Sequence, residues 1–393
     1  MRTILYLSPV AWNCPNTQIR ELVQLLSKDY RILYLDCYSL EFVSLKHFIL
    51  HRKKRAAVIQ TWKSILTSKQ VIIPVFLTRN RYSQSERTSR IDGWLVVFQI
   101  QLMLMVMKSA NCVYANTSFF PFGLTKLSKM KWVFDFYDRS YDVTSQKNNE
   151  IMRANEKWLL EKSELVLVKS KNYLSNVIPT IEPIVSSKLV LTTIGYSVKK
   201  HLKMYPNSNM STNKIIIGYA GGLSERLDYR LIIDSVENFP QVTFVFAGCR
   251  FDNTINLSKM SFAEFSKKLL SYPNVLIQQN SKSKTQQAMT MSKFTFGWIP
   301  YDTSEYFNIY CHPTKFLEYM AVGLPVLSTR IPSLIEHEKY VSFIDSSKAI
   351  STILQNANTL LTTEKIHQRK QFAIEHRIEN RYTQVSSLMK AVI

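Results

Sequence analysis

The sequence predicts an α/β protein made of two doubly wound, parallel-sheet domains, and three observations support this. Short apolar runs alternate with segments that repeat apolar residues at helical spacing, which is the layout of parallel sheets covered by helices. The alternation stops at a polar, turn-rich linker at 198–213 and then starts again. With 393 residues, of which 46% are hydrophobic, the chain is long enough to bury two such cores.

The first domain is expected over residues 1–197. Apolar runs predict buried strands at Thr3–Leu7, Arg31–Leu35, Val71–Val75, Lys131–Phe134 and Leu165–Val168. Helices are expected at Gln18–Leu26, Trp94–Met107 and Glu150–Glu161. The apolar run Trp94–Met107 contains Gln99 and Gln101 and is shorter than the roughly 20 residues that span a bilayer, so we expect a buried helix there. The N-terminus lacks the pattern of a signal peptide.

The second domain is expected over residues 214–370, and residues 371–393 should form a helix that returns to the first domain. Strands are predicted at Lys214–Tyr219, Val242–Ala247, Asn274–Ile277, Phe294–Pro300 and Pro325–Ser328. Helices are predicted at Asp228–Val236, Thr285–Ser292 and Pro313–Val322. Two open sheets of this type bind ligands in a cleft at the carboxyl ends of their strands.

The charge of the chain points to an acidic partner. The formal net charge is +21, and the stretch 42–85 contains no acid but nine basic residues mixed with apolar ones. This mixture favours a helix on an anionic membrane surface over a solvated basic face. Nucleic acid is not expected as a partner, because no nucleic-acid motif accompanies the charge. Five cysteines without CxxC spacing fit neither disulfides nor a zinc site, so we expect a cytoplasmic protein. Together with the basic stretch, this predicts a peripheral protein on the inner face of the membrane.

The most informative segment runs from His312 to Thr329. Pro313 suits the first turn of a helix and Gly323 suits its end. The helix start at Pro313 and Thr314 offers free N–H groups, and Lys315 adds a full positive charge, so together they suit a diphosphate. Glu318 lies one turn deeper, where its carboxylate can accept hydrogen bonds from the hydroxyls of a ribose. Alternatively, Lys315 and Glu318 form an ordinary surface ion pair.

A second segment combines a glycine turn with a cation. A predicted strand leads into Gly221 and Gly222, which let backbone N–H groups approach an anion, and Arg226 can neutralise that anion. The segment is neither a Walker A loop nor a GxGxxG motif, which disfavours a P-loop nucleotidase and an ordinary dinucleotide site. Tyr301, at the end of a predicted strand, is either near the nucleotide or part of the core. His312 is either a phosphate contact or structural.

The order of these motifs resembles the donor half of GT-B glycosyltransferases, most of all family 4 and its relatives, including the glucuronosyltransferase of xanthan assembly. The resemblance covers residues 214–345 well and rests chiefly on the sequence PTKFLEYMAVGLPVLST. It implies two Rossmann-like domains that face a cleft, with a nucleotide-sugar donor bound by Gly221, Gly222, Arg226, Tyr301, Pro313, Thr314, Lys315 and Glu318. The family often has a second glutamate eight positions before the one at Glu318, where this chain has Tyr310.

The resemblance also implies a catalytic base in the first domain. The sequence VFDFYD ends at Asp138, which matches the cleft aspartate of the xanthan-type enzyme. Asp138 can take the proton of the acceptor hydroxyl if the configuration inverts; otherwise such carboxylates cap a helix or pair with Arg139. No DxD sequence occurs, so we expect no metal and no cofactor, with the leaving diphosphate stabilised by Arg226, Lys315 and helix N–H groups.

Together these features predict a glycosyltransferase that moves a sugar from a nucleotide diphosphate sugar to a glycan acceptor, expected to be lipid-linked, in surface polysaccharide or glycoconjugate synthesis. A nucleotide-sugar 2-epimerase would use the same two-domain fold without an external acceptor. A non-catalytic scaffold that binds sugar nucleotides or glycans is a second alternative, and a basic nucleic-acid binder is a third. The retention of both Lys315 and Glu318 argues against the scaffold.

Overall fold

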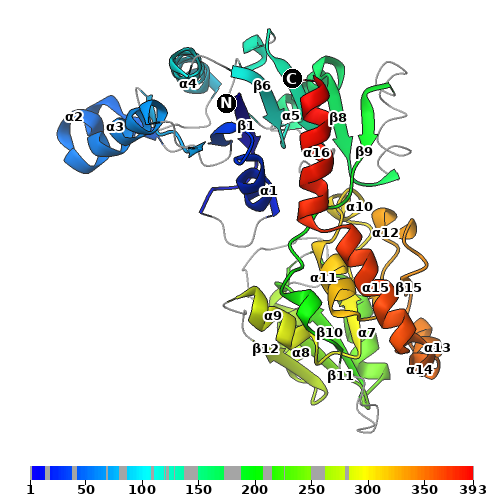
Figure 1. The fold of residues 1–393 in the computed structure, drawn as a ribbon. Helices are drawn as coiled ribbons and strands as arrows, with labels where there is room; N and C mark the ends of the chain where they lie inside the picture. Colours follow the sequence, from blue (N-terminus) through cyan, green and yellow to red (C-terminus); the bar gives the residue numbers. More distant parts are fainter. Residues whose placement is uncertain are drawn as a thin grey trace.

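The structure is a computed structural model of the chain. It describes residues 2–13, 18–37, 42–67, 70–78, 86–107, 110–118, 120, 124–127, 129–136, 149–171, 187–206, 215–224, 226–248, 262–278 and 283–392. These residues form two parallel sheets with their helices, which lie one above the other in Figure 1. The predicted α/β architecture with two Rossmann-like domains is confirmed.

The first sheet has seven parallel strands among the described residues. Their spatial order is β4 (Val71–Ile72), β2 (Arg31–Asp36), β1 (Thr3–Ser8), β6 (Ala110–Ala115), β7 (Lys131–Asp135), β8 (Leu165–Val168) and β9 (Leu189–Leu191). Its helices are α1 (Gln18–Leu26), α2 (Leu45–Leu50), α3 (Arg52–Leu66), α4 (Glu86–Val106), α5 (Asn149–Lys162) and the 3-10 turn η1 (Leu124–Leu127). A two-stranded sheet pairs β3 (Phe42–Ser44) with β5 (Phe76–Thr78).

Several predicted boundaries in this domain need correction. Helix α4 begins at Glu86 and not at Trp94, and β4 ends at Ile72 because Pro74 cannot continue the ladder. Strands β6 and β9 were not predicted. Strand β6 contains Asn111 and Cys112 among its six residues, so its apolar run is too short to stand out, yet it pairs with β1 in the middle of the sheet.

The second sheet has six parallel strands among the described residues. Their order is β12 (Val275–Gln278), β11 (Thr243–Ala247), β10 (Ile216–Ala220), β13 (Phe296–Ile299), β14 (Val326–Ser328) and β15 (Val341–Phe343). Its helices are α7 (Tyr229–Asn238), α8 (Phe262–Leu270), α9 (Lys284–Met291), α10 (Tyr306–Ile309), α11 (Thr314–Val322), α12 (Pro332–Ile335), α13 (Ser347–Gln355), α14 (Ala357–Leu360) and α15 (Thr363–Glu375). The strand order reverses between β10 and β13, which is where open α/β sheets bind ligands.

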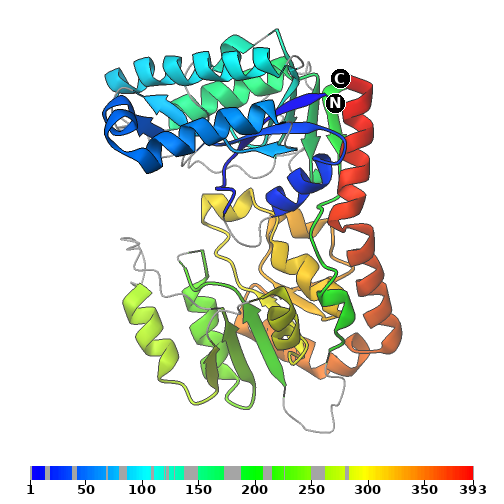
Figure 2. The same ribbon diagram turned by 60° about the vertical axis from the view of Figure 1, so that its left-hand side comes forward.

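The last helix, α16 (Ile378–Val392), leaves the second domain and packs on the first. Figures 1 and 2 show it in red along the first sheet, beyond α15. Its Ile378, Val385 and Met389 are buried in the same cluster as Ile4 and Tyr6 of β1. Since side chains alternate along a strand, the neighbouring residues of β1 face the other side of the sheet, toward α4.

A buried ion pair fixes α16 to the first sheet. Arg381 is 1% exposed and Asp135, at the end of β7, is fully buried, with 2.7 Å between Nη2 and Oδ1. Tyr114 donates a hydrogen bond to the second carboxylate oxygen of Asp135 at 2.7 Å, and Arg381 also donates to Thr192 Oγ1 at 2.6 Å. Removing one partner of such a buried pair would leave the other charge buried and uncompensated, which is strongly destabilising. Asp135 therefore has a structural role and is not a free base in the cleft.

The chain crosses between the domains twice, and the crossings lie together. Tyr196, in the first crossing, accepts a hydrogen bond at its carbonyl from the N–H of Ile378, in the second, at 3.0 Å. The first crossing continues into the 3-10 turn η3 (His201–Lys203), inside the predicted linker. His201 is fully buried and lies against helix α11, so the linker is part of the core of the second domain.

Candidate active site

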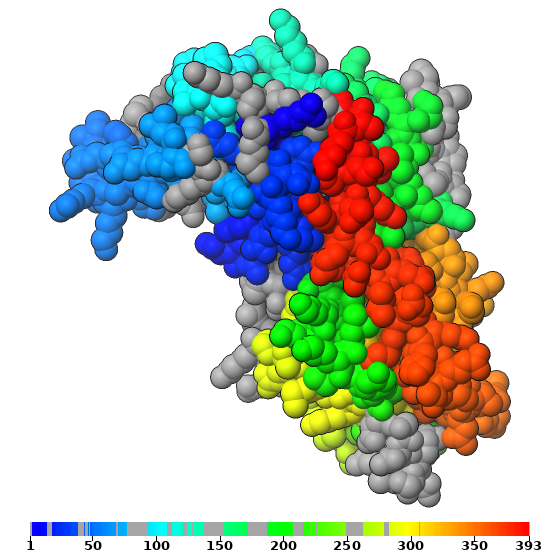
Figure 3. Space-filling view, viewed as in Figure 1, coloured from blue at the N-terminus to red at the C-terminus, as the bar shows by residue number. Residues whose placement is uncertain are grey.

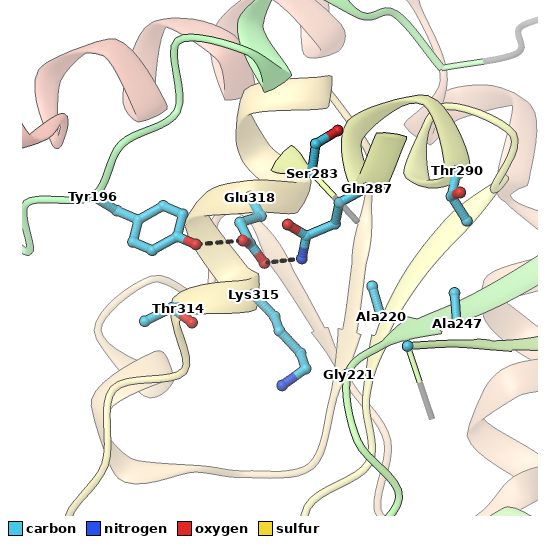
Figure 4. Close-up of a pocket in the computed structure, with 11 residues that line it drawn as sticks. Tyr196, Ala220, Gly221, Ala247, Ser283, Gln287, Thr290, Thr314, Lys315 and Glu318 are labelled. Carbon is cyan, nitrogen blue, oxygen red and sulfur yellow. Dashed lines mark hydrogen bonds between the residues drawn. The ribbon is translucent and has the colours of Figure 1, made fainter. Parts of the chain in front are cut away.

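A cavity of about 200 Å³ opens at the carboxyl ends of β10 and β11. Its walls come from the two strand ends, from α9, from the first two turns of α11 and from Tyr196, where the chain first crosses between the domains (Figure 4). The lining residues are Tyr196, Ala220, Gly221, Ala247, Gly248, Ser283, Gln287, Thr290, Thr314, Lys315 and Glu318. The structure thus brings together four of the predicted donor-site residues, Gly221, Thr314, Lys315 and Glu318.

Glu318 is a buried carboxylate, 3% exposed, and three side chains surround it. Tyr196 donates a hydrogen bond to Oε1 at 2.6 Å, and Gln287 donates one to Oε2 at 3.4 Å (Figure 4). Nε2 of His201 lies 4.0 Å from Oε1. Burial lowers the pKa of His201, although Glu318 opposes this, so the imidazole is neutral at neutral pH and does not form an ion pair with Glu318.

Glu318 and Lys315 therefore do not form the surface ion pair that was considered as an alternative in the sequence analysis. No pattern in the sequence identifies Gln287 or His201 as a site residue. The contact of Tyr196 with Glu318 joins residues 122 positions apart, which no local pattern reveals.

Lys315 points toward the glycine turn. Its ammonium donates a hydrogen bond to the hydroxyl of Tyr301 at 3.0 Å and lies 5.1 Å from the ring centre of Tyr219. Burial alone would lower the pKa of Lys315, but Tyr219 and Tyr301 raise it above its ordinary value, so the group stays charged. A Cβ on Gly221 would collide with Cε of Lys315 and lie 2.7 Å from Nζ. Glycine at 221 is thus required for the ammonium to reach the cavity.

Arg226 is not among the residues that line the cavity. Its guanidinium lies between two aromatic rings, 4.5 Å from the ring centre of Tyr301 and 4.4 Å from that of Phe307. Nε donates to Oδ1 of the fully buried Asn308 at 2.9 Å, and Nη2 donates to Sγ of Cys311 at 3.2 Å. Tyr301 therefore separates the two cations: its ring faces Arg226 and its hydroxyl faces Lys315.

The other predicted site residues lie at or outside the edge of the cavity. Pro313 precedes the first turn of α11 and is buried, while Gly222 is exposed and a Cβ there would meet nothing within 4 Å. His312 is buried beside His337 and Phe316, on another side of α11, and burial lowers its pKa well below the ordinary value. Asp138, the predicted base, lies outside the described residues.

No group of three or more His, Cys, Asp or Glu side chains is placed to hold a metal ion in the part of the chain that the structure describes. The charges nearest to the cavity come instead from Lys315, Glu318 and Lys284. Lys284 opens α9 and lies 4.7 Å from the ring centre of Tyr196. Its ammonium also contacts Oε1 of Glu21 in α1 at 2.9 Å, so one cation joins the first domain to the wall of the cavity.

Comparison with known proteins agrees with this architecture. No family model matches the chain. A curated relative, "Putative teichuronic acid biosynthesis glycosyltransferase TuaH" of Bacillus subtilis (strain 168), is 24% identical over 214 residues, which is 53% of this chain and 50% of that protein. The chain thus spans about half the length of this relative.

Solved structures match over nearly the whole chain. The Anabaena protein HepE in complex with UDP and glucose superposes with a TM-score of 0.63 and 14% identity, covering 99% of this chain and 100% of HepE. Sucrose-phosphate synthase from Thermosynechococcus elongatus gives a TM-score of 0.68 and 14% identity, covering 100% and 99%. TuaH is described as a putative glycosyltransferase, and the two-domain fold shared with these solved structures confirms the resemblance to GT-B enzymes at the level of the fold.

Proposed function

We propose that the chain is a glycosyltransferase that binds a UDP-sugar in the cavity between β10, β11 and α11. The observation that carries this proposal is that a partly buried ammonium, that of Lys315, and a buried carboxylate, that of Glu318, line the same cavity. Lys315 lies at the first turn of α11 and Glu318 one turn deeper, so a diphosphate and a ribose fit in that order along the helix. HepE with bound UDP and glucose supports UDP as the nucleotide.

The proposed reaction breaks the bond between C1 of the sugar and the diphosphate oxygen. That oxygen keeps the electron pair, and Lys315 with the N–H groups at the start of α11 stabilises the negative charge that develops there. An oxygen of the acceptor hydroxyl forms the new bond to C1 and releases its proton. Asp138 remains our candidate for the base that accepts it, on the strength of its sequence context.

Metal independence is part of the proposal. A diphosphate that leaves with its charge uncompensated needs a cation beside it, and Lys315 supplies one in a site screened from water. Arg226 supplies a second positive charge behind Tyr301, within reach of the same region if the Tyr301 ring turns. Both cations are permanent parts of the chain, so donor binding is expected to persist in EDTA.

Calorimetric titration with UDP and GDP, with and without EDTA, tests the donor site. The expected result is saturable, EDTA-insensitive binding of UDP that weakens by about 1.5–3 kcal/mol in Lys315→Met, the scale of a lost charged hydrogen bond. Lys348→Met is the matched control, because Lys348 is exposed on another face. Wild-type protein that binds neither nucleotide would remove the support for an enzyme and favour the scaffold.

The acceptor is proposed to be a lipid-linked glycan, reached from an anionic membrane surface. Helices α2 and α3 form an end of the first domain that projects from the molecule (Figure 3). Ile49, Leu50 and Leu66 are 68%, 63% and 71% exposed there. The basic side chains around them are exposed as well: Lys46, Arg52, Lys53, Lys54, Arg55 and Lys63. Apolar and basic side chains on one projecting surface match the interface of an anionic bilayer.

The other basic residues of the stretch, Lys69, Arg79 and Arg81, lie outside the described residues. No helix in the described ranges is long and apolar enough to cross a membrane. The attachment is proposed to be by the surface of α2 and α3, on the cytoplasmic side where nucleotide sugars are made available.

Sedimentation with lipid vesicles tests the attachment. Binding to vesicles with 30% phosphatidylglycerol should fall steeply with salt, and replacing Arg52, Lys53, Lys54 and Arg55 by Gln should abolish it, since each basic residue near such a surface contributes about 1 kcal/mol. The matched control replaces the exposed Lys199, Lys200, Lys203 and Lys293 by Gln, with the same change in charge. Equal binding by both variants would mean that overall charge, and not this surface, holds the protein.

A further inference from the structure

A second cavity lies in the C-terminal domain, on the edge of the sheet opposite the donor cavity. It has a volume of about 390 Å³ and opens where β14 and β15 begin, beside Pro325 and Val341. The donor cavity lies where β10 and β11 end. Because all these strands are parallel, the two cavities are at opposite ends of the strands and are separate sites.

The walls of this second cavity are rich in positive charge. Lys339, Lys365 and Arg369 line it, against one acid, Glu338. No carboxylate of the described residues forms an ion pair with any of these three cations. The lysines are at least partly open to solvent, whereas Arg369 is 5% exposed. The cavity therefore combines two adaptable cations at its mouth with one fixed cation in its wall.

Arg369 is a buried cation held only by carbonyl groups. Its Nη1 donates to the carbonyl of Gly323 at 3.1 Å and its Nη2 to that of Leu360 at 2.7 Å. Burial lowers its pKa to about 10, so the guanidinium is still charged at neutral pH. A buried charge without a counter-ion is unfavourable, and an anion that enters the cavity relieves this cost.

We propose that the second cavity binds a sugar phosphate, with the phosphate between Arg369, Lys365 and Lys339. The volume equals roughly a dozen water molecules at about 30 Å³ each, which is more than inorganic phosphate alone needs. Ser342 and Tyr340 also line the cavity, and their residue types suit the hydroxyl groups and the apolar face of a sugar. This site does not depend on the function proposed for the donor cavity.

Helix α11 connects the two cavities. Its first two turns carry Lys315 and Glu318 in the donor cavity, and its last carbonyls end at Gly323, where Arg369 is bonded. Gly323 has φ of +95°, and a Cβ there would lie 2.7 Å from Cγ2 of Ile366 in α15, so this end of the helix is tightly packed. A phosphate that competes for Arg369 therefore acts on the end of the helix that carries the donor groups. Occupancy of the second cavity is expected to change the affinity for UDP, and linkage makes that effect reciprocal.

Titration of the full chain with ribose 5-phosphate, in the absence and presence of saturating UDP, tests the proposal. The expected result is one saturable site that persists with UDP bound, weakens at least tenfold in the Lys339→Gln, Lys365→Gln double variant, and is retained in Lys315→Met. The exposed pair Lys293→Gln, Lys348→Gln is the matched control. These variants leave Arg369, and hence the end of α11, intact.

Three results would overturn the proposal. A dedicated site is excluded if ribose 5-phosphate does not bind. It is also excluded if UDP displaces ribose 5-phosphate competitively and Lys315→Met abolishes its binding, or if the two double variants weaken its binding equally. The coupling is tested by the UDP titration: an affinity that changes about fivefold or more when ribose 5-phosphate is present supports transmission through α11, and an unchanged affinity refutes it. Ribose, without the phosphate, should not bind.

Discussion

Replacing Gly221 by alanine is expected to disable the donor cavity without removing any of its functional groups. The new Cβ would collide with Cε of Lys315 and lie 2.7 Å from Nζ, so the ammonium must leave its position beside Tyr301. Gly221 is not among the glycines with positive φ in the described residues, so alanine does not strain the backbone there. Because the end of a lysine side chain moves easily, the free energy of unfolding should change by less than about 1 kcal/mol.

The expected loss of UDP affinity follows from the hydrogen bond between the ammonium and the diphosphate that is lost. A hydrogen bond to a charged group contributes about 1.5–3 kcal/mol, which corresponds to a roughly 10- to 150-fold weaker binding of UDP. Lys315→Met should weaken binding by a similar factor. The Gly221→Ala, Lys315→Met double variant should be no weaker than Lys315→Met alone, because both changes remove the same ammonium and such effects are not additive.

Calorimetry with UDP on the four proteins of this cycle measures the effect, and Gly222→Ala is the matched control. A Cβ at Gly222 meets nothing within 4 Å, so this variant should bind UDP like the wild type. The reasoning is refuted if Gly221→Ala binds UDP as tightly as the wild type, or if the effects of Gly221→Ala and Lys315→Met add fully. Either result would mean that the ammonium of Lys315 does not contact the diphosphate.

Three further predictions concern the base, the contact between the domains and the response to pH. Asp138→Asn should lower turnover about 100-fold or more and leave UDP affinity unchanged, as loss of a general base does; steady-state kinetics and calorimetry check this, and an unchanged rate excludes Asp138. Lys284→Glu should separate the domains by repulsion from Glu21 and increase the radius of gyration in X-ray scattering, whereas adding Glu21→Lys should restore it; equal radii would show that the pair does not hold the domains. Burial lowers the pKa of His337 to about 4, so between pH 6.5 and 4 the unfolded chain binds a proton that the folded chain does not. As the pH is lowered through this window, the free energy of unfolding should decrease by up to about 1.4 kcal/mol per pH unit. Urea titrations should show a weaker dependence of this free energy on pH in His337→Phe but not in the exposed His367→Phe.

The parts of the fold that the sequence predicted are those with local causes. Helix α1 was predicted at its observed bounds, and α11 was predicted from Pro313, one residue before its observed start, with its end at Gly323. Gly323 has the left-handed conformation that its place after the helix requires, and its N–H donates to the carbonyl of Tyr319 at 3.0 Å. In each case a few neighbouring residues contain the whole signal.

The parts that the sequence did not predict depend on contacts between distant residues. Strand β6 has a weak apolar pattern, and its place beside β1 is set by the sheet. Arg226 was expected beside the diphosphate because a glycine turn precedes it, but Asn308, from helix α10, holds its Nε. Tyr196 was assigned to the end of the first domain and His201 to the linker, because their contact with Glu318 exists only once this segment folds onto α11.

Tyr196 connects the donor cavity to the contacts between the two domains. Tyr196 donates to Glu318 in the cavity, and its backbone is bonded to Ile378 at the second crossing between the domains. Lys284 lies over the ring of Tyr196 and contacts Glu21 of the first domain. A rotation of one domain on the other cannot leave all four of these contacts unchanged. The orientation of the Glu318 carboxylate is therefore tied to the angle between the domains. Substitutions at the second crossing, which lies outside the cavity, should alter donor affinity.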